Sequence, residues 1–110
     1  MEINVQKQDS INIVALAGRL DTTNYSELEK KLFELIEKNE IKIIVDCNDL
    51  EYVSSSGLRI FLMGLKKINA ANGRFVLCRL QDNIKEIFEI SGFSTVFEIF
   101  NSIDEAAGSF

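Results

Sequence analysis

The stretch at residues 41–61, IKIIVDCNDLEYVSSSGLRIF, contains an apolar run, then three serines and a glycine, then a second apolar run. Its first part, residues 41–47, is continuously apolar, which is typical of a strand buried on both faces of a parallel sheet. From about Ser55 to Asn72, apolar residues recur every three or four positions, which predicts a helix that stops at Gly73. A buried strand followed by a helix indicates an α/β fold.

The segments before this stretch predict a hairpin and a helix. Residues 3–8 alternate between apolar and polar, and residues 11–18 are apolar and β-branched, so two strands joined by a short turn are expected. Residues 22–40 carry one apolar stripe at helical spacing, and Asn39 is a plausible end of that helix.

The segments after it predict strand and helix twice more: a strand at 74–80, a helix at 81–92, a strand at 95–100 and a helix at 102–108. Asp82 or Asn83 is the expected N-cap of the third helix, Gly92 its stop, and Ser102 the start of the last helix. The order is β-β-α-β-α-β-α-β-α, which predicts a single mixed, mostly parallel sheet in one domain over residues 1–110. The expected core includes Leu16, Ile43, Val45, Leu62, Leu65 and Val76.

Composition excludes several classes of function. The net charge is -5 and no stripe of lysine or arginine is visible, which argues against a nucleic acid or an anionic membrane as partner. There is no histidine, so Ser-His catalysis and histidine-bound metals are excluded. Neither a signal peptide nor an apolar run long enough to cross a membrane is present, so we expect a cytoplasmic protein with Cys47 and Cys78 as free thiols.

The three serines admit two interpretations. At least one of Ser54, Ser55 and Ser56 is expected to cap the helix that follows, by accepting a hydrogen bond from its first turn. The same helix end favours an anion, so a phosphate on an exposed serine would lie in a favourable field. A hydrolase nucleophile is not supported, because the GxSxG pattern is missing, and the Walker A pattern of a phosphate-binding loop is absent too.

Three segments together resemble the anti-sigma-factor antagonists, which are single STAS domains (sulphate transporter and anti-sigma factor antagonist). They are GRLDTTNYSELEKKL at residues 18–32, IIVDCNDLEYVSSSGLRIF at 43–61 and NGRFVLCRLQDNIKEIFEISGF at 72–93. The resemblance covers nearly the whole chain. It implies a regulatory binding protein, with neither catalytic residues nor a metal or other cofactor.

The resemblance also implies a phosphorylation site. In that family the serine after an aspartate, in a D-S-S/A/T-G-L pattern, is phosphorylated by a partner kinase that is itself the anti-sigma factor. Aligned on Gly57 and Leu58, that serine is Ser55, and Ser54 stands where the family usually has aspartate. A serine phosphatase would then restore the unphosphorylated form.

The partner-binding surface implied by the resemblance comprises the serine loop, the adjoining face of the second helix and the segment after the second strand: Asp21, Thr22, Ser54, Ser56, Gly57, Leu58, Arg59 and Met63. Asp21 matches an acidic residue of the family near this site, and it could equally be a helix N-cap.

Two other functions stay open. The chain could be a non-phosphorylated STAS adaptor subunit of a larger assembly, such as a transport system, and Ser54 in place of aspartate favours this reading slightly. It could also sense a small molecule or nucleotide at the helix N-terminus, although no glycine-rich loop supports that function.

Overall fold

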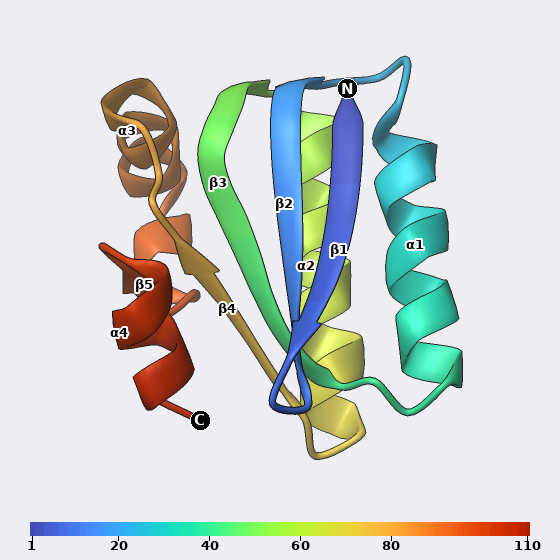
Figure 1. Cartoon of the computed structure of the whole chain (residues 1–110). Coiled ribbons are helices and arrows are strands. Elements are labelled where there is room, and N and C mark those ends of the chain that lie inside the picture. Colours follow the sequence, from blue (N-terminus) through green and yellow to red (C-terminus); the bar gives the residue numbers. More distant parts are fainter.

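The computed structural model describes all residues, 1–110. Its five strands form one mixed sheet in the spatial order β1-β2-β3-β4-β5 (Figure 1). The strands are β1 (Glu2–Gln8), β2 (Ile11–Leu20), β3 (Lys42–Val53), β4 (Arg74–Cys78) and β5 (Ile99–Phe100). The helices are α1 (Tyr25–Glu37), α2 (Ser55–Ala70), α3 (Asp82–Ser91) and α4 (Ile103–Gly108), with a short 3-10 turn at Phe93–Thr95.

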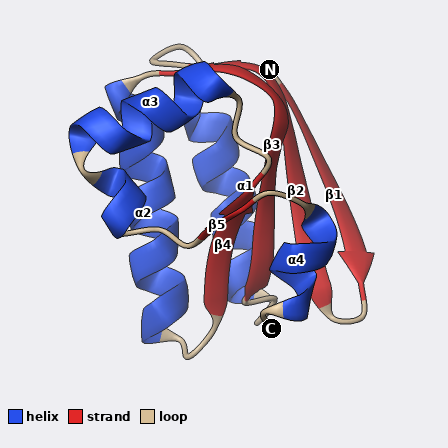
Figure 2. Ribbon diagram, turned by 90° about the vertical axis from the view of Figure 1, so that its left-hand side faces the viewer, coloured by secondary structure: helices blue, strands red, loops and turns tan.

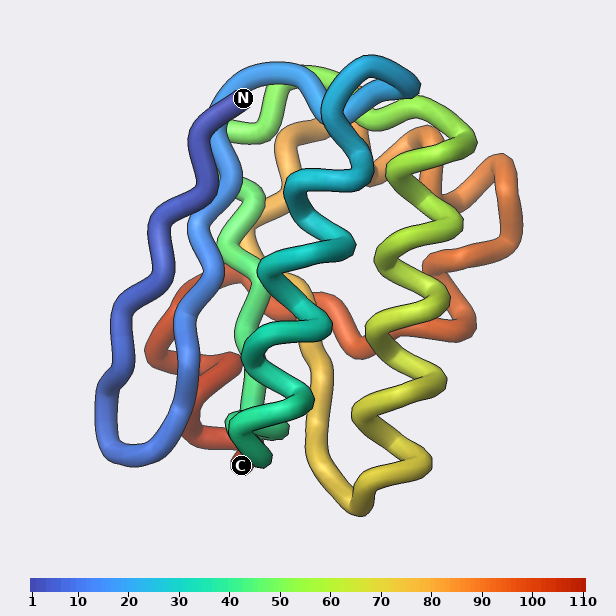
Figure 3. Tube along the Cα trace, turned by 90° about the vertical axis from the view of Figure 1, so that its right-hand side faces the viewer, coloured from blue at the N-terminus to red at the C-terminus, as the bar shows by residue number.

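The predicted topology is confirmed. β1 runs antiparallel to β2, as expected of a hairpin, and each of the other neighbouring strands pairs in parallel. Figures 2 and 3 show α1, α2 and α3 on one face of the sheet and α4 on the opposite face. The sheet is therefore enclosed by helices on both sides, which explains why its central strands are apolar on both faces.

Two apolar clusters fill the spaces beside the sheet. The larger lies under α1, α2 and α3 and includes Leu28, Leu32, Phe61 and Phe88. The smaller lies under α4 and joins Val76 and Cys78 to Ala106. Both thiols, Cys47 and Cys78, are free and buried, as predicted. Burial raises the pKa of Cys47 well above its usual value, and burial together with the Asp46 carboxylate raises the pKa of Cys78 to about 12.

Four of the six predicted core residues are buried, and the two leucines of α2 are not fully so. Leu16, Ile43, Val45 and Val76 are at most 1% exposed. Leu62 and Leu65 are only half-buried and pack against the edge of the core. The buried face of α2 instead passes through Ile60 and Gly64, because the lack of a side chain at Gly64 lets the helix approach the ring of Phe75.

The third strand is longer than predicted. The polar residues at 48–53, expected to be a connection, continue β3 and pair with the end of β2. Their register shifts at two irregularities, which keep Leu50 and Val53 directed into the core. The strand therefore ends directly before the serines, and this sets the position of the serine loop.

The C-terminal elements differ in detail from the sequence-based expectation. The N-cap of α3 is Gln81 and not Asp82 or Asn83, since the Asn83 amide donates instead to the carbonyl of Glu51 on β3. β5 keeps only two residues of the predicted 95–100 strand, because the chain first forms the 3-10 turn.

The predicted stop of α2 at Gly73 is wrong by one residue, because α2 ends at Ala70 and the left-handed residue after it is Asn72, with a φ of 65°. The predicted ends at Asn39, Gly92 and Ser102 are confirmed. Asn39 and Gly92 both adopt positive φ, at 60° and 80°, which ends α1 and α3. Ser102 caps α4 by accepting from the amide of Glu105.

Candidate functional site

The candidate site lies where the carboxyl ends of β2 and β3 meet the N-termini of α1 and α2, at the top of Figures 1 and 3. Leu20 and Val53 are register partners at the ends of their strands. The amide of Ser54 then donates to the carbonyl of Leu20 at 2.9 Å. This bond holds the serine loop beside the loop that contains Asp21.

The three serines differ in surroundings. Ser54 is the N-cap of α2, with an extended backbone, and its Oγ accepts from the amide of Gly57 at 3.3 Å. Ser54 and Ser56 are half-buried, whereas Ser55 is exposed and occupies the first position of the helix. The cap reading is therefore confirmed for Ser54. It leaves the Ser55 hydroxyl exposed to solvent at the positive end of a helix dipole.

Gly57 is required by the packing of α2. A Cβ at this position would lie 2.8 Å from side-chain atoms of both Leu20 and Val53, which are buried. Leu58, the next residue, is also buried. Both residues, predicted to bind a partner, are therefore packed beneath the serine loop and not exposed on its surface.

Asp21 forms a tight turn before α1 and is not its cap. Its Oδ1 accepts from the amide of Thr23 at 2.9 Å and from the Thr23 hydroxyl at 2.6 Å. These two hydrogen bonds, with a smaller contribution from Arg19, lower the pKa of Asp21. The N-cap of α1 is Asn24, whose side chain bonds back to Asp21 and Arg19. The alternative that Asp21 caps the helix is therefore wrong.

The outer face of α2 adjoins the serine loop. Arg59 is exposed and Met63 is half-buried, and Thr22 lies exposed on the neighbouring loop. A shallow groove of about 320 Å³ runs along this face, lined by Arg59, Leu62, Met63, Lys66 and Lys67. Its lining is apolar and basic and contains no carboxylate.

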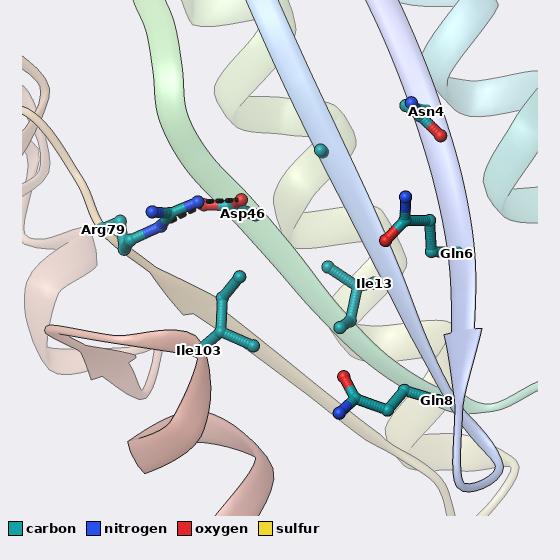
Figure 4. Close-up of a pocket in the computed structure, with 8 residues that line it drawn as sticks. Asn4, Gln6, Gln8, Ile13, Asp46, Arg79 and Ile103 are labelled. Carbon is teal, nitrogen blue, oxygen red and sulfur yellow. Dashed lines mark hydrogen bonds and ion pairs between the residues drawn. The ribbon is translucent and has the colours of Figure 1, made fainter.

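A second polar feature lies on the opposite face of the sheet, beside α4 (Figure 4). A hollow of about 280 Å³ is lined there by Asn4, Gln6, Gln8, Ile13, Ala15, Asp46, Arg79 and Ile103. Asp46 is 6% exposed, and its carboxylate accepts two hydrogen bonds from the Arg79 guanidinium, at 2.9 and 2.6 Å. These bonds raise the pKa of Arg79, whose backbone adopts a left-handed φ of 57°.

Sequence reasoning missed this ion pair and one other contact. The signal for the pair was Asp46, the acidic residue inside the apolar run at residues 43–47. The other contact places the Arg19 guanidinium 4.2 Å from the centre of the Tyr52 ring, and it packs the end of β2 against the end of β3. No sequence signal pointed to Arg19 and Tyr52, because they are brought together by the irregular register of the two strands.

No cluster of three or more histidine, cysteine, aspartate or glutamate side chains that could hold a metal ion is present. None of the helices combines the length and the apolar character needed to span a membrane.

Comparison with known proteins agrees with this geometry. A family model described as STAS domain matches residues 2–106. The protein BtrV of Bordetella bronchiseptica, which carries the name of an anti-sigma factor antagonist, is 36% identical over 110 residues. The match covers 100% of this chain and 95% of that relative.

Two solved structures share the fold. A structure described as an anti-sigma factor antagonist of Thermotoga maritima has a TM-score of 0.93 at 21% identity, covering 97% of this chain and 92% of that one. The phosphorylated form of the Bacillus cell fate determinant SpoIIAA has a TM-score of 0.77 at 20% identity, covering 98% of each chain.

Proposed function

The chain belongs to the STAS domain family, and from this membership we propose that it is an anti-sigma-factor antagonist controlled by phosphorylation of Ser55. Unphosphorylated, it binds an anti-sigma factor that is also a serine kinase, and so releases a sigma factor. Phosphorylated, it dissociates, because a charge of about -2 enters the docking surface. A serine phosphatase restores the binding form, and the cycle runs in the cytoplasm, where the kinase finds ATP.

The observation that carries this proposal is the division among the serines. Ser54 is committed to the cap, whereas the Ser55 hydroxyl is exposed at the first position of α2. A kinase could transfer the γ-phosphoryl group of ATP to the Ser55 Oγ, forming an O–P bond while ADP leaves and the hydroxyl proton passes to a base of the kinase. The helix end would then stabilise the phosphate that it carries.

The departure at Ser54 is compatible with this chemistry. An aspartate is a good N-cap residue, and serine is equally good, so the change preserves the helix start. The Ser54 Oγ accepts from the amide of Gly57, as an N-cap carboxylate would. The proposed function needs the helix end and the exposed hydroxyl, and both are retained.

The test is phosphosite mapping after incubation with ATP and an anti-sigma kinase encoded beside the gene for this chain. One added phosphate, located on Ser55 and absent from Ser55→Ala, is the expected result. Ser56→Ala is the matched control, because it removes a neighbouring half-buried hydroxyl and should leave phosphorylation intact. Phosphate only on Ser54 or Ser56 would show that the alignment is off by one residue.

The second candidate is a STAS adaptor of a larger assembly, and Ser54 in place of the family's aspartate favours it. An adaptor would form a stable complex that ignores ATP. No phosphate on the chain, with the kinase active on another substrate, would reject the switch and leave this function.

A further inference from the structure

Phosphorylation at Ser55 would place an anion one helical turn from a free cation. Ser55 and Arg59 are four residues apart on α2, and side chains at this spacing lie on the same face of a helix. Because each Cα–Cβ bond tilts toward the helix N-terminus, the long side chain of Arg59 can reach back over the turn that begins with Ser55. Both residues are exposed.

Arg59 is available for such a pairing. It takes part in none of the ion pairs or cation–π contacts of the structure, in contrast to Arg19, Arg74 and Arg79. Its own helix contains three basic residues and no acidic one, although the whole chain has a net charge of -5. No carboxylate on α2 therefore competes for the Arg59 guanidinium.

The carboxylate on the neighbouring loop is already engaged. Asp21 holds Thr23 through two hydrogen bonds, and its other oxygen lies 4.0 Å from the Arg19 guanidinium. Arg19 in turn lies over the ring of Tyr52. Beside the serines, Asp21 and Arg19 therefore already contact each other or Tyr52. Arg59 remains as the unpaired cation one turn from Ser55.

We propose, on the basis of the function proposed above, that a phosphate on Ser55 pairs with Arg59 of the same helix. A guanidinium can donate two parallel hydrogen bonds to a phosphate, which makes it a strong binding partner for this group. The modification then changes the docking surface in two ways. It adds negative charge at the helix end, and it draws Arg59 away from the basic groove that it shares with Met63 and Lys66.

The pairing is testable without any kinase. Phosphoserine is placed at position 55 of the full chain during synthesis, and the ionisation of the phosphate is followed by phosphorus NMR across pH 5 to 8 at low salt. A guanidinium partner favours the dianionic form of the phosphate. The midpoint of its titration in the native sequence should therefore be about 0.2–0.4 pH units lower than in Arg59→Gln. This is about a twofold difference in proton affinity.

Lys66→Gln is the matched control, because it removes one positive charge from the same groove without removing the partner at the fourth position. Its midpoint should stay within about 0.1 of the native value, and Arg59→Lys should lie between the native chain and Arg59→Gln. The Arg59 Nε–H signal should also move on phosphorylation. Equal midpoints for Arg59→Gln and Lys66→Gln, with an unmoved Arg59 signal, would overturn the pairing.

The titration of the synthetic phosphoprotein tests the ion pair separately from the kinase reaction, which tests the proposed function. A kinase that fails to modify Ser55 rejects the switch, whereas the synthetic phosphoprotein still reports whether the ion pair forms. Conversely, a phosphate that ignores Arg59 rejects the pair and leaves Ser55 as the phosphorylation site.

Discussion

The Ser54 hydroxyl accepts a hydrogen bond from the backbone amide of Gly57 at 3.3 Å, and this contact gives three consecutive serines different roles. Ser54 closes the first turn of α2. Ser55, one residue later, takes no part in the cap and remains exposed. The helix cap and the exposed hydroxyl that we propose as the phosphorylation site therefore belong to different side chains, and substitutions can separate them.

Removing the cap should cost stability, and removing the exposed hydroxyl should not. Ser54→Ala leaves a helix-end amide without its partner and should lower the free energy of unfolding by about 1 kcal/mol. Ser55→Ala should stay within about 0.5 kcal/mol of the native chain, as is usual for surface substitutions. Urea unfolding of the two variants measures both. An equal loss in the two would mean that Ser55 shares the cap.

Gly57→Ala should destabilise the protein although alanine is the better helix former. The added methyl group would lie 2.8 Å from buried atoms of Leu20 and Val53, and overpacking of this kind costs about 1–3 kcal/mol. The gain in helix propensity is about 1 kcal/mol, so a net loss is expected. Gly108→Ala is the control, because nothing lies near its added methyl group. A Gly57→Ala variant as stable as Gly108→Ala would show that α2 shifts freely.

The order of strands and helices could be predicted because each element carries its own period of apolar residues. What failed were details decided by distant partners. Leu65 lies on the predicted stripe of α2 yet is half-buried, because Gly64 brings a different line of the helix onto Phe75. The extension of β3 through residues 48–53 depends on hydrogen bonds to β2. The local pattern of this largely polar segment does not predict those hydrogen bonds.

The candidate site was predictable for a different reason. Ser54, Ser55 and Ser56 are adjacent in sequence, so a helix start at this point fixes their order and leaves only their orientations open. Asp46 and Arg79, in contrast, are 33 residues apart and meet only after β3 and β4 have paired. A lone aspartate in an apolar strand indicates a buried partner without telling which residue supplies it.

Stability should fall at alkaline pH through the buried thiols. The pKa of Cys78 is raised to about 12 by burial and by the Asp46 charge, so the folded state keeps a proton that the unfolded chain loses above its ordinary value of 9.0. The free energy of unfolding is then unaffected below about pH 8. It decreases as the pH rises above 9, by up to about 1.4 kcal/mol per pH unit for each such thiol.

The check is a series of denaturant titrations between pH 7 and 10.5 on the native chain and on Cys78→Ala. All other ionisable side chains are common to the two chains, so the difference between their slopes isolates Cys78. The variant should lose stability less steeply, with Cys47 accounting for part of the remaining slope. Parallel curves would contradict the burial of an ionisable thiol at this position.

The last prediction concerns the ion pair beneath the polar hollow. Arg79→Ala leaves the buried Asp46 carboxylate with the backbone amide of Asn48 at 3.2 Å and the weak donor of the Cys78 thiol at 3.9 Å, and should cost about 2–3 kcal/mol. That value is below the usual range for a fully buried pair, because the Arg79 side chain is 37% exposed. Asp46→Ala should cost less than Arg79→Ala, since the freed guanidinium can be hydrated. The double variant should cost less than the sum of the two single changes by about 1–2 kcal/mol.

A third variant separates the ion pair from the backbone. Arg79 has a φ of 57°, a conformation that glycine adopts freely and alanine does not. Arg79→Gly should therefore be about 1 kcal/mol more stable than Arg79→Ala, although both lose the same hydrogen bonds. If the two variants were equally destabilised, the whole cost would lie in the lost pair, and the left-handed backbone would be free of strain. If the double variant cost the full sum, Asp46 and Arg79 would contribute independently, and the pair would not hold β3 to the segment that follows β4.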